Sequence, residues 1–103
     1  MIRILLFLAV FAVFPGAATA QSGKPVRIVV PFTPGGLIDV VARLLAQKLA
    51  VTLRQTVIVE NKGGAQGAIA AEMVARSDPD GYTLFGTSGS VIVLNPLLYK
   101  KLP

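Results

Sequence analysis

The side chains in this sequence restrict the chemistry that it can perform. Its 103 residues include no Cys and no His, and only five Asp and Glu residues in total. These counts exclude a disulfide framework, a thiolate or imidazole metal site, a Cys nucleophile and a Ser-His-Asp triad. Backbone amides, hydroxyl groups, cations and a few carboxylates remain. The sequence therefore predicts no metal site and no cofactor.

The carboxylates do not form a pair suited to acid–base catalysis. Asp78 and Asp80 flank Pro79 in a segment with the chemistry of a tight turn. Glu60 stands at the end of an expected strand, beside Asn61. With no catalytic residue to assign, we predict that the protein is not an enzyme.

The first of three loops has groups that can bind an anion. In an open parallel sheet, ligands bind beyond the carboxyl ends of the strands, where loops lead into helices. Residues 31–36 place Gly35 and Gly36 directly before an expected helix, whose first N–H groups favour a carboxylate or phosphate. Asp39 lies in the first turn of that helix, where capping of the backbone is favoured over contact with a ligand.

The other two loops are less specific. Residues 61–67 are rich in glycine but lack the G-x-G-x-x-G spacing, and Leu84 stands about 20 residues beyond Gly64, where a dinucleotide site needs an acid. Close approach of the backbone to a small ligand and plain turn geometry are both open. The third loop supplies the hydroxyls of Thr87, Ser88 and Ser90, for which helix capping is an equal explanation.

Strands and helices alternate along the chain in a pattern that predicts an α/β fold. Short β-branched runs predict strands at 26–31, 56–60 and 82–86, and helices are expected at about 37–53, 68–76 and 91–99, the last disturbed by Pro96. This βαβαβα order predicts a parallel sheet in a three-layer arrangement. The first helix is expected to be amphipathic, with Arg43 and Gln47 opposite an apolar face made of Val40, Val41, Leu44, Leu45 and Leu49.

The first 20 residues have the order of a secretory signal peptide. Arg3 precedes an apolar run at 4–14, a Pro-Gly break, and small residues at Ala18 and Ala20. Eleven apolar residues fall short of the roughly 20 that span a bilayer. We predict export with cleavage after Ala20 and no stable membrane insertion afterwards.

The remaining residues, 21–103, are basic but carry no nucleic-acid signature. The whole chain has a formal net charge of +5, and its cations are scattered without the aromatic residues that stack bases. No nucleic-acid partner is expected. Three parallel strands need cover on both faces. We therefore expect this segment to be the beginning of a larger domain.

The motifs taken together resemble the amino-terminal part of the Bug family, the periplasmic solute receptors of tripartite tricarboxylate transporters. The resemblance rests on KPVRIVVPFTPGGLIDVVARLLAQKL, VIVENKGGAQGAIAAEMVA, DPDGYTLFGTSGS and NPLLYKKLP, which cover residues 24–103 with short gaps. It implies part of domain one of a two-domain receptor that closes around a small carboxylate or related metabolite. It also implies partnership with the membrane components of the transporter. The ligand-binding residues that it implies are Phe32, Pro34, Gly35, Gly36 and Asp39 in the first loop, Gly64 and Ala65 in the second, and Thr87, Ser88 and Ser90 in the third.

The sequence departs from the family pattern at several positions. Ile38 stands where a small hydroxyl residue is usual, Arg54 and Thr56 replace a common Gly and Pro, and Gly63 replaces a common Pro. Family members also continue through the rest of domain one and all of domain two. We therefore expect residues 21–103 by themselves to bind ligand poorly. A small secreted interaction or self-associating module, and a non-functional truncated remnant, are the alternatives.

Overall fold

A computed structural model describes residues 23–102, so the predicted signal peptide and its cleavage site lie outside the described residues. In chain order the elements are β1 (Val26–Val30), α2 (Leu37–Leu53), β2 (Val57–Asn61), the 3-10 turn η2 (Ala65–Gly67), α3 (Ala68–Ala75), β3 (Thr83–Phe85), α4 (Gly89–Val93) and α5 (Asn95–Leu98). The predicted alternation of strands and helices is confirmed. The expected third helix is instead two short helices, because Pro96, in the first turn of α5, lacks an N–H group and cannot lie inside a longer helix.

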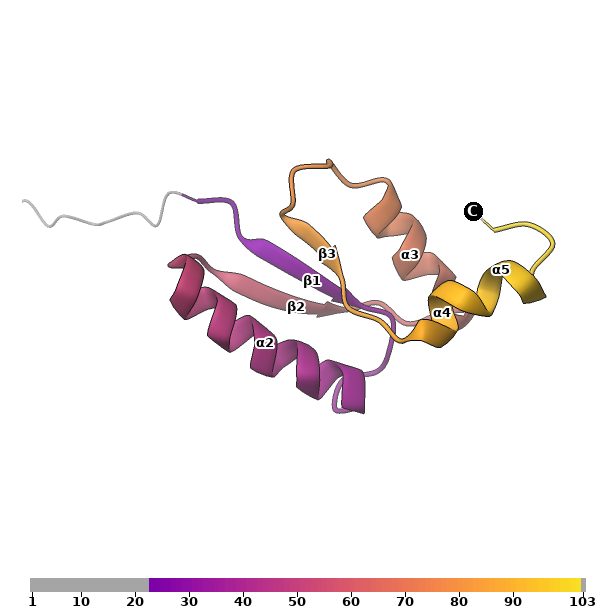
Figure 1. Cartoon of the computed structure of the whole chain (residues 1–103), viewed down its shortest axis with the longest axis horizontal. Coiled ribbons are helices and arrows are strands. Elements are labelled where there is room, and N and C mark those ends of the chain that lie inside the picture. The colour runs from indigo at the N-terminus through magenta and orange to yellow at the C-terminus, as the bar shows by residue number, and fades with distance from the viewer. Residues whose placement is uncertain (1–22, 103) are drawn as a thin grey trace, which may run out of the picture.

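The three strands form one parallel sheet in the order β2-β1-β3. The central strand, β1, is the most buried, and Val29 and Val30 are 0% exposed. The chain moves across the sheet in one direction from β1 to β2 and in the other from β2 to β3. Right-handed crossovers therefore place α2 and α3 on opposite faces, as Figure 1 shows. The predicted three-layer α/β arrangement is confirmed.

Helix α2 packs on the sheet through small residues. Ala42 and Ala46 are buried and form the core with Ile28 and Val30 of β1, and Leu49 packs beside them. Four large residues that we expected on the apolar face are instead about half exposed, namely Val40, Val41, Leu44 and Leu45. The sequence prediction of the packed face was wrong because it followed the large aliphatic residues, whereas close contact with a sheet favours alanine.

A turn between α3 and β3 fixes the start of the third strand. The carboxylate of Asp80 accepts the N–H of Tyr82 at 2.9 Å and pairs with the Lys24 ammonium at 2.7 Å. Gly81 has a φ of +79°, which suits a residue without Cβ. Among residues 23–102, no helix is long and apolar enough to cross a membrane.

Candidate ligand-binding site

The segments that follow the three strands meet at the carboxyl ends of the sheet and surround a pocket of about 280 Å³. This is the edge at which open parallel sheets bind ligands. Each of the three loops, or the helix after it, contributes to the wall. The lining residues are Pro31, Phe32, Gly64, Gln66, Gly67, Ser90, Val91, Leu94, Asn95 and Leu98.

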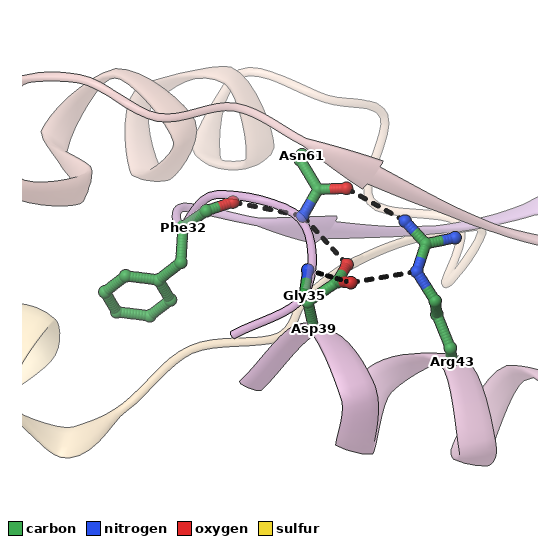
Figure 2. A network of polar contacts seen from close by, with 5 residues as sticks. All are labelled: Phe32, Gly35, Asp39, Arg43 and Asn61. Carbon is green, nitrogen blue, oxygen red and sulfur yellow. Dashed lines mark hydrogen bonds and ion pairs between the residues drawn. The ribbon is translucent and has the colours of Figure 1, made fainter. Parts of the chain in front are cut away.

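The first loop is held by a buried carboxylate. Asp39 is 2% exposed; its Oδ2 accepts the N–H of Gly35 and the Nε–H of Arg43, each at 2.9 Å, and its Oδ1 accepts the Asn61 amide at 2.9 Å. The same amide donates to the carbonyl of Phe32 at 3.0 Å, and the Asn61 Oδ1 accepts from Arg43 at 3.1 Å. Figure 2 shows these five residues joined in one network. It fastens the first loop to the end of β2.

The hydrogen-bond network explains why Asp39 has a low pKa. The Arg43 guanidinium, followed by the Gly35 and Asn61 amides, lowers the pKa of Asp39 to about 2. The carboxylate also satisfies the N–H of Gly35, which directly precedes the helix N-cap residue Gly36. Gly36 itself has no side-chain capping hydrogen bond, so the capping role favoured from the sequence stays a prediction, and the observed bond holds the loop one residue before the cap. The N–H of Gly35 consequently already has an acceptor within the protein.

The second loop has a left-handed backbone over four successive residues. The φ angles are +119° at Gly64, +46° at Ala65, +52° at Gln66 and +88° at Gly67. Such angles are unfavourable for Ala65 and Gln66 because their Cβ atoms approach the following carbonyl oxygen. Gly67 is also enclosed, since a Cβ there would lie 2.9 Å from the side chain of Val91. The loop is therefore tightly shaped where it lines the pocket.

The third loop brings two hydroxyl groups together. The Oγ atoms of Ser88 and Ser90 are 2.7 Å apart. Ser88 is the N-cap residue of α4, but its side chain makes no capping hydrogen bond, so capping does not explain it. The Oγ1 of Thr87 is buried without a hydrogen-bond partner among the described residues. The exposed pair of hydroxyls therefore belongs to Ser88 and Ser90, while that of Thr87 is closed off from the surface.

Comparison with known proteins identifies the family. Residues 41–103 match the family described as "Tripartite tricarboxylate transporter family receptor". The chain belongs to this receptor family. The resemblance found in the sequence is confirmed.

Individual relatives of the receptor agree with this assignment. Protein BugT of Bordetella pertussis is 41% identical over 95 residues, a match that covers 87% of this chain and 29% of BugT. Two solved structures share the fold. The periplasmic binding protein BugD is 56% identical with a TM-score of 0.56, covering 59% of this chain and 20% of BugD. MatC from Rhodopseudomonas palustris, solved with bound malate, is 49% identical with a TM-score of 0.57, covering 59% of this chain and 21% of MatC. The receptor chain thus spans less than a third of the length of each of these three proteins.

The structure gathers only some of the predicted site residues around the pocket. Phe32, Gly64 and Ser90 line it, and seven others lie outside its lining, namely Pro34, Gly35, Gly36, Asp39, Ala65, Thr87 and Ser88. Sequence reasoning missed Gln66 and Asn95, which line the pocket, and it gave no role to Arg43 and Asn61 in the network behind the first loop. The Asn-Pro pair at the start of a helix was the one sequence signal that could have pointed to Asn95.

Proposed function

We propose that this receptor chain contributes the domain-one wall of a site that binds a small carboxylate or related metabolite. The observation that carries the proposal is the pocket of about 280 Å³ at the carboxyl edge of the sheet. Its wall is mainly apolar, with Ser90, Asn95, Gln66 and glycine backbone as its polar groups. A few polar groups in an apolar wall suit a small organic anion, whose carbon skeleton and charged end need different surroundings. The bound malate in MatC supports the choice of ligand class.

The second loop supplies an electrostatic reason for anion binding. Gly67, the N-cap residue of α3, lines the pocket. The first N–H groups of a helix lack partners within the helix and carry the positive end of its dipole. The N–H groups of Gly67 and Ala68 already donate to the carbonyls of Gly64 and Ala65. We therefore propose that the positive end of the α3 dipole attracts the ligand carboxylate and that the hydroxyls of Ser88 and Ser90 contact it.

Ser90→Ala tests the proposed site in the titration of the chain with malate and citrate by calorimetry. We expect the dissociation constant to rise roughly threefold to tenfold, as for the loss of one neutral hydrogen bond. Thr52→Ala is the matched control, because it also removes one hydroxyl, which donates to the carbonyl of Lys48 on exposed α2. Equal affinities of wild type and both variants for malate and citrate would count against ligand binding in this pocket.

We also propose that residues 21–103 bind ligand weakly without further receptor sequence. A site with one wall leaves the ligand in contact with water, and two-domain receptors bury it between their domains. Citrate, glutamate and nicotinate are suitable test ligands. A micromolar dissociation constant for any of them would contradict this part of the proposal.

Catalysis is not part of the proposed function. Asp39 is the most buried carboxylate in the described chain, but three donors hold it ionised with a pKa of about 2. A general base works best with a pKa near the working pH, so Asp39 is poorly suited to that role. Its hydrogen bonds support a role in shaping the first loop.

The proposed location is the periplasm, with residues 1–20 as a cleaved signal peptide and residues 21–103 as part of domain one. The proposed partners are the membrane components of a tripartite tricarboxylate transporter. The family match and the periplasmic relatives support the location and the partners. Amino-terminal sequencing of the periplasmic fraction should give Gln21 as the first residue, and an intact amino terminus would contradict cleavage.

Self-association is a second candidate function that one observation favours. Large aliphatic side chains stand exposed along the outer face of α2, among them Leu37 at 78% and Val51 at 79%. Exposed apolar patches of this kind often mark interfaces.

A further inference from the structure

The strained second loop needs a contact that holds it in place. Ala65 and Gln66 have positive φ angles that side-chain-bearing residues rarely adopt. Such backbone persists only where the surrounding structure determines it, and it is often found at ligand sites. Within the loop, the N–H of Gly67 donates to the carbonyl of Gly64 at 3.0 Å and the N–H of Ala68 donates to the carbonyl of Ala65. The carbonyl of Gln66 finds its partner outside the loop.

Asn95 supplies that support from a distant part of the chain. Its Nδ2 donates to the carbonyl of Gln66 at 2.9 Å across 29 residues of sequence. Asn95 is only 5% exposed and is the single buried polar residue of α4 and α5. It is also the first residue of α5, where the following Pro96 fixes the backbone. The donor is therefore held on a rigid turn.

The position of this hydrogen bond connects it to the pocket. Gln66 and Asn95, which share this hydrogen bond, both line the cavity. Their neighbours in the chain, Gly67 and Leu94, line it as well. A change of φ at Gln66 would turn the peptide groups on both sides of it. The N–H of Gly67, at the entrance to α3, belongs to one of these groups.

We infer that Asn95 is a positioning residue for the carboxylate pocket, whose side-chain amide keeps the second loop left-handed so that its backbone faces the ligand. This inference rests on the proposed function. Asn95 acts through Gln66 and does not itself need to touch the ligand. Its role differs from that of Asp39, which shapes the first loop from behind.

The test compares the wild-type chain with Asn95→Asp and Asn95→Ala. Asp has the shape of Asn but no hydrogen to donate when ionised, and Ala removes the donor without burying a charge. The amide–Hα couplings and carbon shifts of Ala65 and Gln66 report φ directly by NMR without ligand. Malate is then added to each protein, and the shifts of Gly64 and Gly67 are followed. The dispersed amide signals of β1 confirm that each variant is folded.

We expect both variants to lose the left-handed signature at Ala65 and Gln66, and the malate dissociation constant to rise roughly threefold to tenfold. In a Gln66→Gly background the same substitutions should raise the malate dissociation constant less, because glycine adopts positive φ without strain. A variant with wild-type couplings and a wild-type malate response would overturn the inference. If malate leaves wild type unchanged while the variants still lose the left-handed loop, the proposed function fails and the structural role of Asn95 is supported.

Discussion

At the scale of single residues, Asp39 links the first loop to the end of β2. Its lowered pKa means that folding favours the ionised form, so its stabilising contribution is complete above the ordinary value of 3.8 and is lost as the pH falls towards about 2. When Asp39 is protonated, the hydrogen bonds from its three donors lose the negative charge that strengthens them.

Urea unfolding of the chain at a series of pH values tests this role. We expect the unfolding midpoint of wild type to fall between about pH 4 and pH 2 more steeply than that of Asp39→Asn, with the variant less stable near pH 7. Asp78→Asn is the control, since its carboxylate lies in an exposed turn. If the unfolding midpoints of wild type and Asp39→Asn changed in parallel with pH, the network would not stabilise the fold through the ionised Asp39.

Arg54 is strained at the end of α2. It adopts the left-handed conformation, with φ +52° and ψ +41°, as the C-cap residue, a position commonly taken by glycine. Arg54 is exposed, and it replaces the glycine common in the family pattern. We expect Arg54→Gly to raise the free energy of unfolding by about 1 kcal/mol, measured by urea denaturation.

Arg54→Lys is the matched control because it keeps the charge and the Cβ. It should leave the stability unchanged to within about 0.5 kcal/mol. If Arg54→Gly were neutral or destabilising, the left-handed cap would not be a source of strain.

At the scale of elements, helix α2 depends on its small inner residues. Ala46 is 6% exposed against the sheet, whereas its neighbour Leu45 is 50% exposed. Ala46→Leu should therefore destabilise the chain by about 1–3 kcal/mol through overpacking. Leu45→Ala removes as many carbon atoms as Ala46→Leu adds, yet it should cost less than about 1 kcal/mol because Leu45 is half exposed. Thermal or urea unfolding of the two variants would show the reverse order if the large residues formed the packed face.

The elements themselves were predictable, and the packed face of α2 was not. Strands and turns carry local signals, such as the β-branched run at 26–30 and the Asp-Pro-Asp-Gly sequence before β3. Helix α2 is apolar around most of its circumference, so periodicity alone cannot choose a face. That choice depends on which side chains are short enough for the sheet, and Ala42 and Ala46 meet this condition.

The location of the site could be predicted from the sequence, but many of the residues that form it could not. Parallel strands bring their carboxyl ends to one edge, so the three loops could be named from the sequence. Asn95 and Gln66 meet through a hydrogen bond that spans 29 residues, and no local pattern encodes such a contact. Their pairing follows only from the packing of α5 near the second loop.

At the scale of the whole molecule, apolar surface is left without a covering element. On α2 the exposed residues Leu37, Val41, Leu44 and Val51 recur at three- to seven-residue intervals along one side. Such a stripe is typical of a helix that packs against another helix. The described residues provide no element that covers it.

We expect this surface to make the chain self-associate as its concentration rises. Sedimentation velocity should show a weight-average mass that increases with concentration for wild type, and clearly less increase for Leu44→Lys, which places a charge in the stripe. Gln47→Lys adds the same charge to an exposed polar position and serves as the control. A wild-type chain that stays monomeric at all concentrations would show that the stripe is not an interface.

Titration of the isotope-labelled chain with malate, followed by amide chemical shifts, tests whether a carboxylate binds at the edge of the sheet. We expect the changes to concentrate at Phe32, at Gly64 and Gly67, and at Ser88 and Ser90, with saturation only on the order of millimolar ligand. Amides on the outer face of α2, such as that of Val51, should not move. Shifts confined to α2, or no shifts around the pocket at any malate concentration reached, would contradict carboxylate binding at the edge of the sheet.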